Sequence, residues 1–351
     1  MKKLTRRGHE ISVVGIYSGS GIIKRISIRT GYPPLLFTKR FSNLSDELGT
    51  DIEFKRGGYL VLIERESQWE QIKKNVELQN SLGIPSKILD IKEALEIVPY
   101  LNPDAILGSV YCPIDGHANP LLTVWAYYHW LSDKGVTIKK FTEVVGIKEK
   151  KGKIVGVETS NGEFIAAPVV VNAAGGWSQK VAAMLGIELP LRSERHQILV
   201  TEPIAPLFHC MVISFITGLY IQQVPHGSII AGIGEKDAPE FNMESSWQFL
   251  NIMAHQIQNT LPALTTLHIV RQWAGMYNKS PDATPILGPV DGLEGFYLAC
   301  GFSGHGFMVA PVVGEIIASL ITDKEPPFDP TPLYLDRFTK GELIQEPSVV
   351  G

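Results

Sequence analysis

The spacing of apolar residues predicts helices in several parts of the chain. Asp90 can cap the N-terminus of one helix, and Asn119 followed by Pro120 gives another a cap and a proline at its first helical position. Glycines at 83 and 135 directly follow two of the runs, as is typical of helix ends. We expect helices over 67–82, 90–98, 120–134, 245–260 and 306–322.

Alternating and continuous apolar runs predict strands between these helices. The run from Pro168 to Asn172 is uninterrupted, which is typical of a strand buried on both faces of a sheet. Short strands are expected around Ile138, Val145 and Val155, separated by Lys-Gly and Asn-Gly turns. Residues 22–44 show no pattern that we can assign. Other strands are expected over 11–14, 58–63, 197–201, 219–224, 228–233 and 296–300.

Strands and helices alternate near both ends of the chain, whereas antiparallel strands dominate its middle. This order predicts an α/β fold, in which a nucleotide-binding domain is built from separated segments and an α+β domain with an antiparallel sheet is inserted into it. We expect the nucleotide-binding domain to comprise residues 1–50, 112–190 and 280–330, the inserted substrate domain residues 51–111 and 191–279, and a C-terminal tail residues 331–351.

Composition narrows the class of protein. Hydrophobic residues make up 44% and charged residues 19% of the 351 residues, and the formal net charge of −4 gives no reason to expect a nucleic-acid partner. Cys112, Cys210 and Cys300 lie far apart without a metal-binding spacing, which fits free thiols in a reducing compartment. No apolar run approaches the ~20 residues that cross a bilayer, and no signal peptide follows Met1. We therefore expect a soluble cytoplasmic protein without a metal site or a transmembrane segment.

The most informative motif is the glycine-rich run 301–306, Gly-Phe-Ser-Gly-His-Gly, which follows a predicted strand and opens a predicted helix. Glycines let a backbone approach a ligand closely, and a helix N-terminus offers unpaired N–H groups and the positive end of the helix dipole. For a flavin, these donors can stabilise the negative charge that develops on the pyrimidine edge of the reduced ring. The alternative is a tight strand–helix connection in which the glycines serve packing alone.

Two further runs could contact a ligand. Residues 173–177, Ala-Ala-Gly-Gly-Trp, end a buried strand at the edge where α/β sheets bind ligands. Residues 271–277 carry Arg271 and Tyr277 and precede a rigid loop that contains Pro281 and Pro285. Both runs also have an ordinary explanation, because small residues often serve packing and an arginine in a strand is often a surface or ion-pair residue.

In this order and spacing, the three runs resemble the FAD-dependent D-amino-acid oxidase family, which includes sarcosine oxidase and glycine oxidase. The resemblance extends from about Asp51 to Gly341 and is greatest for the beta subunits of dye-linked L-proline dehydrogenase and heteromeric sarcosine oxidases. It implies a Rossmann-like FAD-binding domain and a substrate domain whose sheet covers the flavin. The implied reaction is hydride transfer to the flavin from the carbon beside the nitrogen of a secondary or small amino acid, such as L-proline or sarcosine. The implied partners are this small amino-acid substrate and the other subunits of a heteromeric enzyme.

The resemblance also assigns residues. His305, Arg271 and Tyr277 are the candidates for catalytic contacts. The position of the cysteine that carries covalent flavin in monomeric sarcosine oxidases matches Gly275, so FAD is expected to be non-covalent. The lysine that binds the substrate carboxylate in monomeric sarcosine oxidases matches Met308, and the corresponding arginine of glycine oxidase matches Tyr277. The residue that binds the carboxylate here is therefore open, and Arg271 is a candidate. The matching flavin-contacting positions are Gly301, Ser303, Gly304, His305, Gly306, Phe307 and Met308, then Ala174, Gly175 and Trp177, and finally Arg25.

The chain departs from this family near its N-terminus. Family members begin with a strand and a GxGxxG turn that binds the FAD pyrophosphate, whereas residues 4–10 match sequence that normally follows the turn. Val14 and Gly15 stand where an acidic, ribose-binding residue is usual. A truncated gene start would produce this pattern, and so would a non-catalytic partner subunit that has lost FAD. We expect an FAD domain that is incomplete at its N-terminus, and both explanations stay open.

Overall fold

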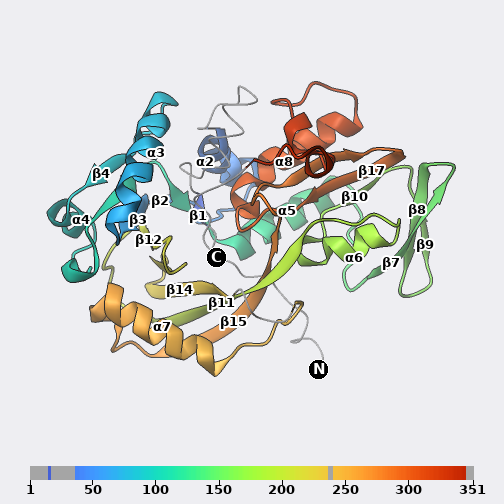
Figure 1. Cartoon of the computed structure of the whole chain (residues 1–351). Coiled ribbons are helices and arrows are strands. Elements are labelled where there is room, and N and C mark those ends of the chain that lie inside the picture. Colours follow the sequence, from blue (N-terminus) through green and yellow to red (C-terminus); the bar gives the residue numbers. More distant parts are fainter. Residues whose placement is uncertain (1–14, 17–35, 236–239, 345–351) are drawn as a thin grey trace.

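The structure is a computed structural model of the chain and describes residues 15–16, 36–235 and 240–344. It combines mixed sheets with helices that cover them, which confirms the predicted α/β class (Figure 1). The predicted strand over 11–14 and the candidate Arg25 lie outside the described residues.

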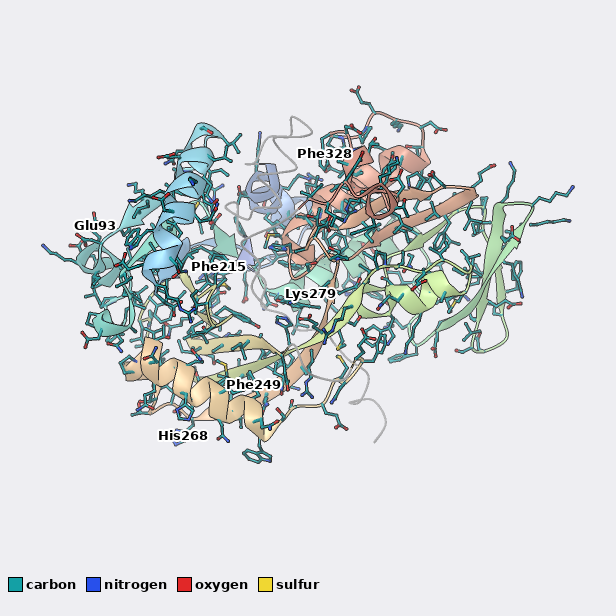
Figure 2. The ribbon with its side chains drawn as sticks, in the orientation of Figure 1. Glu93, Phe215, Phe249, His268, Lys279 and Phe328 are labelled. Atoms are coloured by element: carbon teal, nitrogen blue, oxygen red, sulfur yellow. The ribbon has the colours of Figure 1, made fainter. Side chains whose placement is uncertain are left out.

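The largest element of the fold is an eight-stranded sheet. Its strands are β3 (Tyr59–Ile63), β4 (Lys87–Leu89), β5 (Gly108–Cys112), β11 (Arg192–Pro203), β12 (Met211–Ile213), β13 (Tyr220–Gln223), β14 (Ser228–Glu235) and β15 (Ile269–Lys279). They lie in the order β15-β11-β14-β13-β12-β3-β5-β4. All neighbours are antiparallel except β12 and β3. Lys279 at the end of β15, labelled in Figure 2, forms a 2.7 Å ion pair with Glu194 of β11. The antiparallel strands expected in the middle of the chain are therefore confirmed.

The two faces of this sheet pack differently. Helices α4 (Ile91–Ile97) and α7 (Trp247–Thr260) cover one face, where Phe249 of α7 is buried (Figure 2). The opposite face carries a second apolar cluster that includes Tyr59, Ile198 and Tyr220. Because side chains alternate along a strand, His196 lies on the same face as Ile198. Helix α3 (Trp69–Ser81) lies beside β4, and its Trp69 packs on this second cluster.

The smaller sheet positions the glycine-rich run. Its strands are β7 (Val144–Lys150), β8 (Lys153–Thr159), β9 (Phe164–Ala166), β10 (Val170–Asn172), β16 (Ile286–Val290) and β17 (Leu293–Cys300). The path is β10-β17-β8-β7, and β10 runs parallel to β17. In the described part of the chain β10 is an edge strand, and Val171 is 38% exposed. The expectation that this strand is buried on both faces is therefore wrong.

Three helices form a layer against the smaller sheet: α2 (Leu36–Leu48), α5 (Pro120–Asp133) and α8 (Gly306–Ile321). Phe41, Leu44 and Leu48 repeat at helical spacing on α2 and are buried against α8. Part of α2 falls in residues 22–44, for which the sequence predicted no element. A short sheet of β1 (Gly15–Ile16), β6 (Gly116–His117) and β2 (Lys55–Arg56) adjoins this layer.

The other sequence predictions differ from the structure in few places. The helices expected at 67–82, 90–98, 120–134, 245–260 and 306–322 are present as α3, α4, α5, α7 and α8. Asp90 caps α4 by accepting a hydrogen bond from the Glu93 N–H at 2.8 Å. Ile138 lies in no strand and is 38% exposed, so that prediction is wrong; β9 is the third strand after β7 and β8 instead.

The C-terminal segment packs into the molecule. Arg337 begins the short helix α9 (Arg337–Lys340) and is 1% exposed. It forms a bidentate ion pair with Asp282, with distances of 2.9 and 3.0 Å, and donates to the backbone oxygen of Thr284 at 2.7 Å. This contact joins the end of the described chain to the loop that follows β15.

Candidate flavin and substrate site

The glycine-rich run connects β17 to α8 in a conformation that depends on its glycines. The φ angles of Gly301, Ser303 and Gly304 are +72°, +51° and +92°. Glycine adopts such values without strain, whereas Ser303 needs support from its surroundings. The run therefore has a fixed and unusual backbone, as expected for a loop that approaches a ligand closely.

Asn278 on β15 anchors this loop. Its Oδ1 accepts a hydrogen bond from the Gly301 N–H at 2.9 Å, and its backbone oxygen accepts one from the Ser303 N–H at 3.0 Å. The Ser303 hydroxyl accepts a hydrogen bond from the Ser280 N–H at 3.2 Å. The large sheet thus holds the loop in place through the residues at the end of β15.

The N-terminus of α8 is available to a ligand. No side chain caps the helix, and no acidic residue lies in its first turn. The first N–H groups of a helix carry partial positive charge, so this end favours an electron-rich or anionic ligand edge. Phe307 lies in this first turn and borders the pocket described next.

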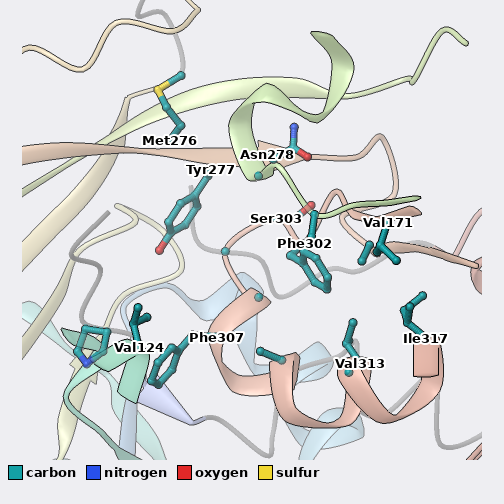
Figure 3. Close-up of a pocket in the computed structure, with 18 of the residues that line it drawn as sticks. Val124, Val171, Met276, Tyr277, Asn278, Phe302, Ser303, Phe307, Val313 and Ile317 are labelled. Atoms are coloured by element: carbon teal, nitrogen blue, oxygen red, sulfur yellow. The ribbon is translucent and has the colours of Figure 1, made fainter. Parts of the chain in front are cut away.

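A pocket of about 650 Å³ lies against this loop and helix. Figure 3 shows Tyr277 extending from β15 toward Phe307, with Phe302 and Ser303 of the loop on another side of the same space. Along α8 the lining is apolar, and Val171 of β10 also borders the space. The remaining lining residues are Pro120, Val124, Ala173, Gly175, Met276, Asn278, Ala299, Gly304, Gly306, Ala310, Val313, Gly314, Ile317, Ala318 and Ile321.

His305 is buried beside the helix start. Burial lowers its pKa to about 4, although a hydrogen bond with the backbone of Phe302 acts in the opposite direction. Its imidazole is therefore neutral near pH 7. Its Nδ1 is buried without a hydrogen-bond partner among the described residues, and the side chain is not part of the pocket lining described above.

The second predicted contact lies at the carboxyl end of β10. The Ala174 N–H donates to Asn172 Oδ1 at 3.3 Å, and Gly175 lines the pocket. Trp177 is 38% exposed, lies near Phe241 and does not line the pocket. The structure brings this run to the pocket through its small residues.

The other predicted residues are more widely spread. Met308 is 5% exposed and its side chain packs in the core against α2, so only its backbone can face the loop. Arg271 is exposed on β15, six residues and roughly 20 Å of extended strand from Tyr277. The structure therefore brings Tyr277, but not Arg271, to the pocket.

These features fit a flavin. An apolar space bounded by two phenylalanines and an uncapped helix start suits a flat ring system with one polar edge. Gly304 allows the loop to pass close beside the ring of Tyr277.

Two residues at this site were not among the candidates predicted from the sequence. Asn278 directly follows Tyr277, and His196 stacks on Tyr277 with ring centroids 3.5 Å apart. For Asn278, the available signal in the sequence was an asparagine placed directly after a run of strand residues. The pairing of β11 with β15, which only the fold establishes, brings His196 to Tyr277.

Two absences apply to the described residues. No group of three or more His, Cys, Asp or Glu side chains is arranged to hold a metal ion. None of the helices in this part of the chain is long and apolar enough to cross a membrane.

Comparison with known proteins identifies the family. Residues 35–320 match the model of the DAO family, FAD dependent oxidoreductases. Sarcosine oxidase subunit beta of Rhodobacter capsulatus is 29% identical over 317 residues, which cover 89% of this chain and 75% of that protein. Glycine oxidase of Pseudomonas putida is 29% identical over 248 residues, covering 71% of this chain and 67% of that protein.

A solved structure confirms the fold. The crystal structure of L-proline dehydrogenase from P. horikoshii superimposes with a TM-score of 0.82 and 35% identity, covering 95% of this chain and 91% of that one. The Rossmann-like FAD-binding fold predicted from the sequence is therefore confirmed, and FAD is the cofactor that the family uses. The chain belongs to the DAO family of FAD-dependent oxidoreductases.

Proposed function

We propose that this chain oxidises the CH–NH bond of a secondary or small amino acid, of the L-proline or sarcosine type, as the beta-type subunit of a dehydrogenase or oxidase. The observation that carries the proposal is the pocket between the glycine-rich loop, the start of α8 and Tyr277. The similarity to sarcosine oxidase beta subunits and to an L-proline dehydrogenase supports this substrate class and a heteromeric assembly.

When bound, FAD supplies the hydride acceptor for such an oxidation. The chain's own residues then have distinct tasks. The free N–H groups at the start of α8 stabilise negative charge at one edge of the pocket. The apolar residues of α8 and Phe302 exclude water, which strengthens each polar contact inside.

We propose that Tyr277, which lines the pocket, contacts the substrate or the flavin ring, and that neutral His305 acts beside it at the start of α8. Arg271 lies too far along β15 to reach the carboxylate of a small amino acid bound in this pocket. Residues 51–111 and 191–279 would form the substrate domain, and residues 1–50, 112–190 and 280–330 the FAD domain, with 331–351 as the C-terminal tail. The three free, buried cysteines suit the cytoplasmic location that we also propose.

The test is the visible absorption spectrum of the purified chain, with and without added FAD, before and after anaerobic L-proline or sarcosine. We expect a flavin band near about 450 nm that bleaches with substrate and is lost on denaturation followed by filtration, since the flavin is non-covalent. Tyr277→Phe is expected to raise the KM and keep the flavin band, whereas Arg271→Lys should leave the KM unchanged because Arg271 lies away from the pocket. A chain that takes up no flavin in excess FAD would contradict the proposal and favour a non-catalytic partner subunit.

A further inference from the structure

The ring of Tyr277 is held from two sides. The imidazole of His196 on β11 stacks on it with an interplanar angle of 18° and a centroid distance of 3.5 Å. On the loop side, a Cβ added to Gly304 would lie 2.6 Å from Tyr277 Cε2. The ring is therefore packed between His196 of the large sheet and Gly304 of the loop, and it also borders the pocket.

His196 is held by packing rather than by polar contacts. It is 6% exposed, and neither ring nitrogen has a hydrogen-bond partner among the described residues. Burial lowers its pKa to about 3, and the charge of Lys279 acts in the same direction. A buried polar atom without a partner carries a desolvation cost, so the two ring nitrogens of His196 do not stabilise the fold through hydrogen bonds.

The neighbours of His196 in the sheet explain why its ring is available to Tyr277. Its register partners are Gly234 on β14 and Gly275 on β15, neither of which has a side chain. Tyr277 lies two residues beyond Gly275 on the same face of β15. Side chains on neighbouring strands normally pack against one another. Here the His196 imidazole packs on the Tyr277 phenol, because the glycines opposite His196 leave the space free.

We propose that His196 is a positioning residue for substrate binding, whose stacked ring fixes Tyr277 so that the phenol oxygen is presented to the pocket. In Figure 3 this oxygen points away from β15, toward Phe307 and Val124. The inference rests on the proposed function, because Tyr277 is one of the substrate contacts proposed above. It adds a residue that acts through Tyr277 and makes no contact with substrate itself.

Two substitutions separate stacking from other roles. His196→Phe keeps a flat ring of similar size, and His196→Ala removes it. For His196→Ala we expect the KM for the amino acid to rise at least about tenfold, with less change in kcat and an unchanged FAD content. His196→Phe is expected to stay within about threefold of the wild-type KM and to melt at a higher temperature, because it removes two unpaired buried nitrogens. Val200→Ala, on the same face of β11 but away from Tyr277, serves as the control and should leave the KM unchanged.

A second readout needs no turnover. Trypsin releases residues 272–279 as one peptide, in which Tyr277 is the only tyrosine. Nitration by tetranitromethane, followed by mass spectrometry of this peptide, measures how accessible and mobile the phenol is. We expect nitration to be about fivefold or more faster in His196→Ala and unchanged in His196→Phe and Val200→Ala, because only the first loses the stacked ring.

The two readouts also separate this inference from the proposed function. A wild type that oxidises no amino acid would contradict the proposed function, and the nitration rates would still decide whether His196 fixes Tyr277. The inference is overturned if His196→Ala changes neither the KM nor the nitration rate. It is equally overturned if His196→Phe is impaired as strongly as His196→Ala, since a flat ring would then not be sufficient.

Discussion

Single buried residues hold parts of the chain that are distant in sequence. Arg337 and Asp282 are 1% and 0% exposed at their side chains, and they join the C-terminal segment to the loop after β15. Burial alone would raise the pKa of the Asp282 carboxyl, but the hydrogen bonds and charge of Arg337 lower it below its ordinary value. Asp282 therefore stays ionised: the backbone N–H groups of Thr284 and Ile344 also donate to it, and Arg337 is its ionic partner.

At the residue scale we predict that Arg337→Met destabilises the protein by about 3–5 kcal/mol, because it leaves the Asp282 charge buried without compensation. Urea unfolding followed by circular dichroism measures the change. The double variant Asp282→Asn, Arg337→Met removes both charges and is expected to be less destabilised than the single variant. A double variant as unstable as the sum of the two single ones would show that the pair is not coupled.

The site is built where the loop between β17 and α8 meets the end of β15. β17 and α8 supply the glycine-rich loop, and the end of β15 supplies Asn278 and Tyr277, which fix it from the other side. The backbone of the loop is compatible with this approach only because position 304 has no side chain. An added Cβ there would collide with Tyr277 and would also stand at a φ of +92°.

At the element scale we predict that Gly304→Ala weakens FAD binding at least about tenfold and displaces Tyr277, because the loop must move away from β15. Fluorescence titration with FAD measures the first effect, and the nitration of Tyr277 the second. Gly186→Ala is the matched control: its φ is +71°, but nothing lies within 4 Å of the added Cβ. Gly186→Ala should lower the stability of the fold only by the backbone strain, about 1–2 kcal/mol. Equal loss of FAD affinity in both variants would assign the effect to strain rather than to the contact.

Across the whole molecule, three buried histidines link stability to pH. Burial lowers the pKa of His117 to about 4, that of His196 to about 3 and that of His305 to about 4. In the unfolded chain a histidine titrates near about 6.5. Between these values the unfolded chain binds protons that the folded chain does not, so stability rises with pH in this window and is lost as pH falls from about 6.5 to 4.

At this scale we predict that the free energy of unfolding falls by up to about 1.4 kcal/mol per pH unit for each of these histidines below pH ~6. Unfolding curves between pH 7 and pH ~4.5 measure the slope. His196→Phe removes one of these histidines and is expected to lower this slope by up to about 1.4 kcal/mol per pH unit. Val200→Ala, which changes no titrating group, should leave the slope unchanged. A slope that His196→Phe does not alter would show that His196 is protonated in the folded state.

Local sequence was sufficient for elements whose own residues specify them. The cap at Asp90, the Asn-Pro start of α5 and the glycine-rich connection into α8 all follow from nearby residues, and the structure has them as expected. Helix α2 was not predicted, because its first residues show no clear helical pattern. Its apolar residues Phe41, Leu44 and Leu48 are recognised as a buried face only when they are seen packed against α8. Val171 was expected to be fully buried because its strand is apolar, but burial depends on the neighbours that a strand has in the sheet.

The α/β class, the resemblance to a flavin-dependent family and the loop at Gly301–Gly306 can be predicted from the sequence, because they depend on composition, element order and glycine content over short distances. Which of the candidate residues share a site depends instead on the tertiary structure. The pairing of β11 with β15 brings His196 to Tyr277, across 81 positions of sequence. The same strand β15 carries Arg271 away from the pocket while it places Asn278 under the loop. Such contacts arise from strand register and chain crossing, which no local pattern of residues encodes.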